Sequence, residues 1–286
     1  MPSLFIVATP IGNLEDISLR ALRVLREVKL IAAEDTRKTR RLLTRYDIKT
    51  HMTSYHEHSD QEKLNYLLGY LENDDVALVC NAGTPGISDP GYGLVVAASE
   101  HSIPVVPIPG PSVAITALVT SGLPTDRFTF VGYLPYKTGA RRRFLESIAT
   151  EPGTIVALEA PHRLLAALND IISVLGDKKI AVCRELTKLH EEVFRGSISE
   201  AIKYFAEPRG EFTLVIEGRM EKTKPEVTAS IERQLRYMQM AGTTAKEAIK
   251  TIAEETGVSR KELYQTWLRL DKSWEKESCQ SFGRSK

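Results

Sequence analysis

The stretch VALVCNAGTPGISDPG, residues 76–91, decides the fold of this 286-residue chain. Its first five residues, Val76 to Cys80, are apolar, which is typical of a buried strand. The loop that follows contains three glycines and two prolines. Glycine adopts backbone angles closed to other residues and lets a ligand approach the main chain, and proline holds the loop still. We therefore expect a strand whose carboxyl end runs into a ligand-binding loop.

Two other stretches repeat this pattern. The apolar run at residues 4–8 is followed by TPIGN, residues 9–13, and the run at 103–106 is followed by PIPGPS, residues 107–112. Ligands of open parallel sheets bind beyond the carboxyl ends of the strands, so the three loops predict one shared site. One such turn alone is more often structural. Sites for a nucleoside triphosphate or NAD are not supported, because no loop has the GxxxxGK[ST] pattern and none is a GxGxxG following a strand.

Strand-length apolar runs alternate with helical spacing in two sets, which predicts two α/β domains. The first domain, residues 1–111, has predicted strands at 4–8, 30–33, 76–80 and 103–106. This alternation is typical of a mostly parallel sheet with right-handed crossovers. The second domain, residues 112–219, has predicted strands at 128–131, 154–158, 180–183, 192–194 and 212–216, and predicted helices at 141–148 and 163–175.

The remainder of the chain has only helical periodicity. Residues 220–227 are polar and contain a proline, which is typical of a linker. Residues 228–271 predict a small helical domain, in which Gly257 ends one helix and Ser259 caps the next. A helix, a short turn and a second helix form the layout of a helix-turn-helix. We expect residues 272–286 to be a tail.

Composition and charge favour an ordinary globular protein. The chain is 42% hydrophobic and 26% charged, with a formal net charge of +1. The three cysteines, Cys80, Cys183 and Cys279, have neither metal-site nor redox-motif spacing, which favours reduced thiols and a cytoplasmic location. We expect no membrane span, because the most apolar long window, residues 103–119, contains four prolines.

Two polar clusters leave alternatives open. The segment after the strand at 30–33 carries five basic residues, namely Arg37, Lys38, Arg40, Arg41 and Arg45. Such a run forms either a solvated helix face or a surface for a polyanion. The histidines His51, His56 and His58 follow in a predicted polar loop. We interpret them as surface residues and expect no metal, because no cysteine or HExxH context accompanies them.

Six motifs together resemble the tetrapyrrole methylase superfamily, and they are most similar to its branch that methylates ribosomal RNA. They are LFIVATPIGNLEDIS, ALVCNAGTPGISDPG, PIPGPS, EAPHR, RELTKLHEE and GEFTLVIEG, and they span residues 3 to 219. The resemblance implies a class III methyltransferase fold of two α/β domains with S-adenosylmethionine in the cleft between them, usually as a homodimer. The helical C-terminal domain also fits the family. The implied reaction methylates the ribose 2′-oxygen of a cytidine in the decoding region of 16S ribosomal RNA in the small ribosomal subunit.

The cofactor site expected from the loops and this resemblance includes eleven residues. They are Pro10, Asn81, Ala82, Gly83, Thr84, Ile87, Pro109, Gly110, Ser112, Ala160 and Thr213. The family usually reads SDAGTP where this chain reads CNAGTP, so Asn81 replaces a carboxylate with an amide. An amide still accepts a hydrogen bond but does not neutralise positive charge.

A ribose hydroxyl is a poor nucleophile at neutral pH and needs a base or hydrogen-bond acceptor nearby. Four residues at predicted strand ends or in the loops after them are candidates, namely Glu34, Asp35, Lys188 and Glu191. Each could equally be a structural ion-pair partner.

Two other functions are alternatives to RNA methylation. One is methylation of a small tetrapyrrole, and the other is a DNA-binding regulator whose α/β part senses a ligand. The basic run favours a polyanion over a tetrapyrrole. The regulator is disfavoured because its recognition helix would offer only Arg260 and Lys261 to the major groove.

Overall fold

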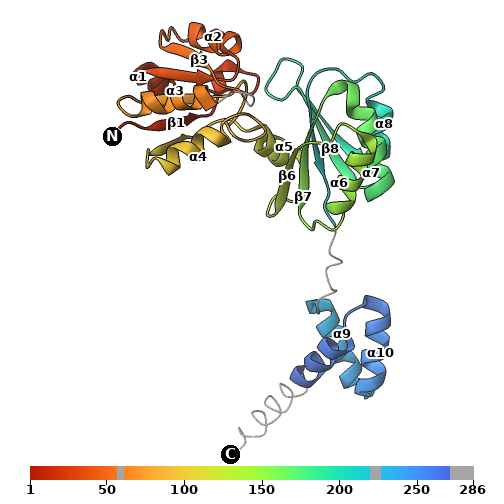
Figure 1. The fold of residues 1–286 in the computed structure, drawn as a ribbon. Helices are drawn as coiled ribbons and strands as arrows, with labels where there is room; N and C mark the ends of the chain where they lie inside the picture. Colours follow the sequence, from red (N-terminus) through yellow and green to blue (C-terminus); the bar gives the residue numbers. More distant parts are fainter. Residues whose placement is uncertain (57–60, 220–226, 271–286) are drawn as a thin grey trace, which may run out of the picture. The chain divides into compact units, whose positions relative to one another are not determined.

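The computed structural model describes residues 1–56, 61–219 and 227–270. The chain divides into two compact units, Met1–Arg219 and Met220–Lys286. The first unit contains two five-stranded sheets, and the described part of the second is helical (Figure 1). No helix in the described ranges is long and apolar enough to cross a membrane.

The first sheet is entirely parallel, as the alternating pattern predicts. Its strands lie in the order β3-β2-β4-β1-β5. Their bounds are β1 (Leu4–Val7), β2 (Leu30–Ala33), β3 (His51–Ser54), β4 (Val76–Val79) and β5 (Val105–Ile108). Helices α1 (Leu19–Glu27) and α2 (Thr36–Arg45) pack on one face, and α3 (Gln61–Leu71) and α4 (Tyr92–Glu100) pack on the other. All five strands therefore end at one edge, where the glycine and proline loops begin.

Two details of this sheet differ from the prediction. Strand β5 begins at Val105, two residues later than predicted, and contains Pro107. Proline is tolerated there because β5 is an edge strand that bonds only to β1. Strand β3 falls in the segment predicted as a polar loop. It lacks an apolar signal because its first and last residues, His51 and Ser54, are exposed.

The second sheet is mixed rather than parallel. Its order is β6-β7-β10-β8-β9, and only the β6–β7 pair is parallel. The strand bounds are β6 (Phe128–Tyr133), β7 (Thr154–Glu159), β8 (Lys179–Arg184), β9 (Glu192–Ser197) and β10 (Phe212–Ile216). Both pairings of β10 are antiparallel, which a pattern of strand-length runs does not reveal.

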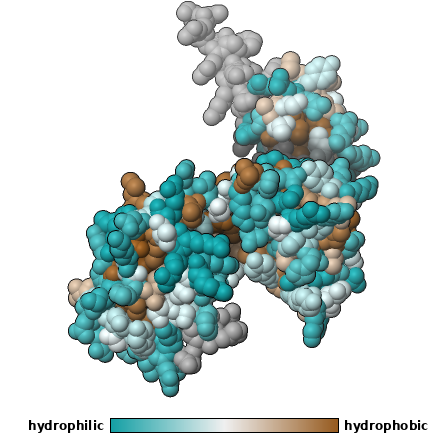
Figure 2. All heavy atoms as spheres, turned by 90° about the horizontal axis from the view of Figure 1, so that it is seen from above, coloured by the Kyte–Doolittle hydropathy of each residue, from teal (hydrophilic) through white to brown (hydrophobic). Residues whose placement is uncertain are grey.

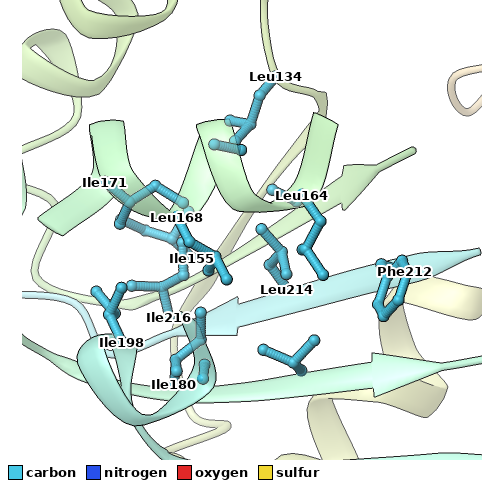
Figure 3. Packing of buried hydrophobic residues seen from close by; sticks show 14 of the residues in the cluster. Leu134, Ile155, Leu164, Leu168, Ile171, Ile180, Ile198, Phe212, Leu214 and Ile216 are labelled. Atoms are coloured by element: carbon cyan, nitrogen blue, oxygen red, sulfur yellow. The ribbon is translucent and has the colours of Figure 1, made fainter. Parts of the chain in front are cut away.

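Helices cover both faces of the second sheet. Helix α5 (Val113–Ser121) packs on one face, and α6 (Thr138–Ser147), α7 (Leu164–Leu175) and α8 (Ile198–Tyr204) pack on the other. Helix α8 was not predicted. Figure 3 shows Leu164, Leu168 and Ile171 of α7 above Leu214 and Ile216 of β10. Burying one such side chain contributes about 1.5–3 kcal/mol.

The second unit has its own core. Helices α9 (Ala229–Met240) and α10 (Ala245–Thr256) are followed by a helical segment at 260–270. Buried Leu235, Ile252, Leu263 and Trp267 hold these helices together. Gly257 ends α10 with a positive φ of 72°, and the Ser259 hydroxyl accepts a hydrogen bond from the backbone N–H of Glu262 at the next helix start. The predicted tail and most of the predicted linker lie outside the described residues.

Candidate functional site

The loops after β1 and β4 are joined through their backbones at the carboxyl edge of the first sheet. The N–H of Thr9 donates to the carbonyl of Gly83 at 2.8 Å, and the N–H of Gly83 donates back at 3.0 Å. The Thr9 hydroxyl also donates to the Cys80 carbonyl at 3.1 Å. Two of the three loops predicted to share a site are therefore in direct contact.

Two glycines let these loops approach each other. Gly83 is buried and has a φ of 85°, a conformation that costs other residues about 1–2 kcal/mol. Gly110, in the loop after β5, lies so close to β1 that an added Cβ would be 3.1 Å from the Ala8 Cβ. The loop after β5 therefore packs against the end of β1, and the three loops form one edge.

Asn81 links the ends of β2 and β4. Its backbone N–H donates to the Glu34 carboxylate at 3.0 Å. Its side-chain Oδ1 is buried and has no partner among the described residues. A buried acceptor without a donor is costly, by about 1–3 kcal/mol. The amide oxygen of Asn81 is thus available to a ligand that brings its own N–H or O–H group.

The sheet topology explains why a site forms at this position. Strand β2 leads to β3 on one side, whereas β4 leads to β5 on the other side of the sheet. Ligands of open α/β sheets bind where neighbouring connections diverge in this way. Glu34 directly follows β2, and Asn81 lies two residues beyond β4.

Residues of the second sheet adjoin the loop after β1. Ile11 shares an apolar cluster with Ala114 of α5, Val156 of β7 and Val215 of β10. Thr213, two residues before Val215 and hence on the same face of β10, is 3% exposed. Ala160 directly follows β7, and its N–H donates to the Glu159 carboxylate at 2.9 Å.

The loop after β8 also reaches this site. A Cβ added at Gly12 would lie 2.6 Å from both Lys188 Cγ and Thr187 Oγ1, so these backbones are close together. Thr187 Oγ1 is a second buried oxygen without a partner in the described structure. Loops from both sheets therefore converge around residues 9–13.

The other predicted cofactor residues vary in exposure. Pro10 is buried, Thr84 and Ser112 are half-buried, and Ala82, Ile87, Pro109 and Gly110 are exposed. Ser112 is the N-cap residue of α5, so a ligand at this edge would meet the N–H groups of that helix. The role of each of these residues in cofactor binding stays a prediction.

All four predicted catalytic residues have local partners. Asp35 caps α2 by accepting from the Arg37 N–H at 2.9 Å, and its interactions with Arg37 lower the pKa of its carboxyl. Lys188 forms ion pairs with Glu185 at 2.9 Å and Glu211 at 2.8 Å. Glu191 accepts from the Thr187 N–H at 2.6 Å. Glu34 accepts a hydrogen bond from the Asn81 N–H. All four residues remain catalytic candidates, and each also has a structural role.

Asp89 is a further acidic residue at this edge and is not among the four predicted catalytic residues. It is half-buried, and burial raises the pKa of its carboxyl to about 6. The nearby Glu34 carboxylate also raises it, whereas a hydrogen bond with the Cys80 thiol lowers it. The sequence signal that could have identified Asp89 is its position in the GISDPG motif after β4.

The basic run lies on α2 beside the same edge. Arg37, Lys38, Arg40, Arg41 and Arg45 are all exposed. Arg37 pairs with Asp35 at 3.2 Å, and Arg45 stacks on Tyr46. The described ion pairs include none to Lys38, Arg40 or Arg41. Because α2 starts where β2 ends, its first turn borders the site.

Two cavities lie at opposite ends of the first sheet. One of about 490 Å³ lies beside the loop after β4 and is lined by Tyr55, Asp89 and Tyr92 among others. Another of about 700 Å³ lies at the amino ends of the strands, beside Lys29 and Lys49. The smaller cavity lies at the carboxyl ends of the strands, where parallel sheets bind ligands, and none of the eleven predicted cofactor residues lines it.

The predicted histidine loop shows no metal centre in its described part. No group of three or more His, Cys, Asp or Glu side chains is arranged to hold a metal ion within the described ranges. His51 begins β3, and His58 lies outside the described residues.

Comparison with known sequences identifies the family. A profile described as Tetrapyrrole (Corrin/Porphyrin) Methylases matches residues 3–202. The chain belongs to this family. The family resemblance inferred from the sequence motifs is thereby confirmed.

Relatives of this methylase carry the name ribosomal RNA small subunit methyltransferase I. One from Synechocystis sp. is 47% identical over 276 residues, covering 95% of this chain and 99% of that protein. One from Escherichia coli O157:H7 is 44% identical over 268 residues, covering 92% and 93%. One from Thermotoga maritima is 48% identical over 222 residues, covering 77% of this chain but 100% of that protein.

Solved structures confirm the methyltransferase fold. A diphthine synthase superposes with a TM-score of 0.61 at 14% identity, covering 75% of this chain and 89% of that one. Uroporphyrin-III C-methyl transferase from Thermus thermophilus, complexed with S-adenosylhomocysteine, superposes with a TM-score of 0.54 at 21% identity. The match covers 75% of this chain and 97% of that one. At these identities the similarity establishes the fold and not the substrate.

We expect Asn81→Asp to bind S-adenosylmethionine at least as tightly as the parent, and up to about tenfold more tightly. A charged acceptor forms a stronger hydrogen bond than an amide, by about 1 kcal/mol, and less where solvent reaches it. Repulsion from Glu34 opposes this gain. Calorimetry measures the affinity, with Asn81→Ala as the control that removes the acceptor and should bind more weakly. Clearly weaker binding by the aspartate variant would mean that the pocket requires the amide.

Proposed function

We propose that the protein transfers a methyl group from S-adenosylmethionine to 16S ribosomal RNA, at the ribose 2′-oxygen of a cytidine in the decoding region. The observation that carries this proposal is the extent of similarity to relatives named ribosomal RNA small subunit methyltransferase I, which covers 92–95% of this chain at 44–47% identity. The site geometry supports it, because three loops converge on an edge with an unpartnered amide oxygen.

The residues at this edge suit S-adenosylmethionine. Its adenine and amino acid parts offer N–H groups that could bond to Asn81 Oδ1 and to loop carbonyls, and its carboxylate suits the start of α5. The cofactor carries the reactive methyl group on a sulfonium. The contribution of the protein is then to hold the two reactants in line, since positioning alone can supply a large part of the rate.

The proposed partner is the small ribosomal subunit, and the proposed active form is a homodimer. Exposed apolar side chains support the homodimer, namely Ile115, Val119 and Leu189, which are 45%, 65% and 93% exposed. On the face shown in Figure 2, hydrophobic residues form separate patches in a mostly hydrophilic surface. Sedimentation equilibrium would test the homodimer, for which we expect a mass of twice the 31.9 kDa of one chain. A ribosomal substrate would place the protein in the cytoplasm.

A substrate panel tests the proposed reaction. Purified protein with a methyl-labelled donor is offered small subunits, naked ribosomal RNA, duplex DNA and a tetrapyrrole. Label in RNA alone supports the proposal. Label in the tetrapyrrole, or binding to DNA without methylation, would support one of the two alternatives instead.

We expect replacement of Arg37, Arg40 and Arg41 by glutamate to weaken RNA binding and flatten its salt dependence. Each phosphate that the protein no longer neutralises lowers the slope of log affinity against log salt by roughly 0.7 to 0.9. Filter binding at several salt concentrations measures the slope. The affinity for S-adenosylmethionine should not change, because these side chains are exposed on α2.

A matched control reverses three exposed basic residues at the opposite edge of the same sheet, namely Arg26, Lys29 and Lys49. Its salt slope should stay at the parent value. If the two triple variants behave alike, α2 is only a solvated helix face.

A further inference from the structure

Asp89 lies where three elements meet. Glu34 after β2 and Cys80 after β4 are close enough to shift the pKa of its carboxyl, and Tyr133 of β6 is close enough for the charge of Asp89 to raise the pKa of its hydroxyl. The neighbouring Ser88 also touches β6, because a Cβ added at Gly132 would lie 2.9 Å from Ser88 Oγ. The segment carrying Asp89 therefore packs between the first sheet and the end of β6.

The backbone around Asp89 is held in an unusual conformation. Gly86, Ser88 and Gly91 have positive φ angles of 82°, 60° and 143°. Ser88 is a non-glycine residue, so its conformation costs free energy that the surrounding structure must offset. A Cβ at Gly91 would lie 2.8 Å from Leu78 Cδ2, so this turn is pressed against β4. Asp89 is one of the residues that line the cavity of about 490 Å³.

Asp89 and its neighbour Glu34 have no cationic partner among the described residues, whereas three other acidic residues of the first unit do. Asp35 pairs with Arg37, Glu159 with Arg163, and Glu185 with Lys188. The ion pairs found in the described ranges include none to Asp89. A half-buried carboxylate that is not neutralised and lies beside Glu34 holds a proton more strongly than usual. Its pKa of about 6 suits proton transfer near neutral pH.

We propose that Asp89 is the general base that accepts the proton of the ribose 2′-hydroxyl during methyl transfer. This inference rests on the proposed function. The 2′-oxygen forms a bond to the methyl carbon while the bond from that carbon to sulfur breaks, which leaves S-adenosylhomocysteine. The bond between the 2′-oxygen and its hydrogen breaks, and the proton passes to the Asp89 carboxylate. Water later removes that proton.

The test compares Asp89→Asn with the parent in single-turnover methylation of small subunits between pH 5 and 9. The parent rate should rise tenfold per pH unit below about 6 and level off above it. The asparagine variant should be roughly 100-fold slower or more at pH 7.5 and should lose this rise. Its affinities for S-adenosylmethionine and RNA should stay within about threefold of the parent, because asparagine keeps the shape and hydrogen-bonding oxygen of the side chain.

Two more variants separate catalysis from structure. Glu34→Gln removes a charge that raises the pKa of Asp89 but keeps an acceptor for the Asn81 N–H, so the midpoint of the pH profile should move to lower pH. Asp177→Asn removes an exposed carboxylate that bonds to Ser199 of α8, and the profile should not change. An NMR titration of the Asp89 carboxyl carbon in the free protein should give a midpoint near 6.

Two results would overturn the inference. One is an asparagine variant that binds both ligands and methylates within tenfold of the parent rate with the same pH profile. The other, decisive if that variant does not fold, is a parent rate that shows no rise with pH below about 6. A parent protein that methylates no RNA would instead refute the proposed function.

Discussion

Replacement of Gly83 by valine should reduce the affinity for S-adenosylmethionine by roughly 100-fold or more while the protein stays folded. Gly83 has a φ of 85°, which costs a side chain about 1–2 kcal/mol and is least tolerable for a β-branched residue. A loop that relaxes from this conformation loses the two backbone hydrogen bonds to Thr9, each contributing about 1 kcal/mol. Cofactor binding must then offset both the conformational cost and the lost hydrogen bonds. Each 1.4 kcal/mol of this free energy lowers the affinity tenfold.

Calorimetry measures the cofactor affinity of the Gly83 variant. The control is a substitution at a glycine that has no such conformational constraint. Gly69 lies within α3, and an added Cβ there would meet nothing within 4 Å. Gly69→Ala should therefore bind the cofactor like the parent. Circular dichroism confirms that both variants are folded. Unchanged affinity in a folded Gly83→Val protein would show that the loop after β4 is not the cofactor pocket.

Removal of the second unit by ending the chain at Arg219 should raise the small-subunit concentration needed for half-maximal methylation by about tenfold or more. A tethered second binding unit increases the apparent affinity for a large substrate without changing the first site. Cofactor affinity should be unaffected, because the second unit has its own core. A chain that ends at residue 270 is the matched control and should behave like the full protein.

The Thermotoga maritima relative makes this prediction sharper. It matches this chain over 222 residues, which is its whole length, and the first unit here ends at Arg219. A protein of that name therefore has the length of the first unit alone, which favours an auxiliary binding role for the helical unit over a catalytic one. Equal subunit requirements for the truncated and full-length chains would contradict that role.

The first sheet could be predicted from sequence because its central strands are buried on both faces. Strands β2 and β4 are buried along their whole length and read as continuous apolar runs. Strand β3 could not be recognised, since its end residues are exposed at the edge of the sheet. The antiparallel pairings of β10 were hidden for another reason, because strand direction depends on connections between distant segments.

The loops of the candidate site were predictable, but its electrostatics were not. Glycines and prolines mark Gly83 and Gly110 in the sequence, and the structure brings their loops together. The contact between Glu34 and Asn81 joins residues 47 positions apart. The raised pKa of Asp89 depends on burial and on Glu34, and neither is visible until the chain is folded.

One measurement tests the central claim most directly. Small subunits that lack the modification are incubated with the protein and methyl-labelled S-adenosylmethionine, and the 16S ribosomal RNA is digested to nucleosides and analysed by mass spectrometry. We predict labelled 2′-O-methylcytidine, at most one per subunit, in a fragment from the decoding region. Label on a base, label on another ribose, or no label in RNA while a tetrapyrrole is methylated would contradict the proposed function.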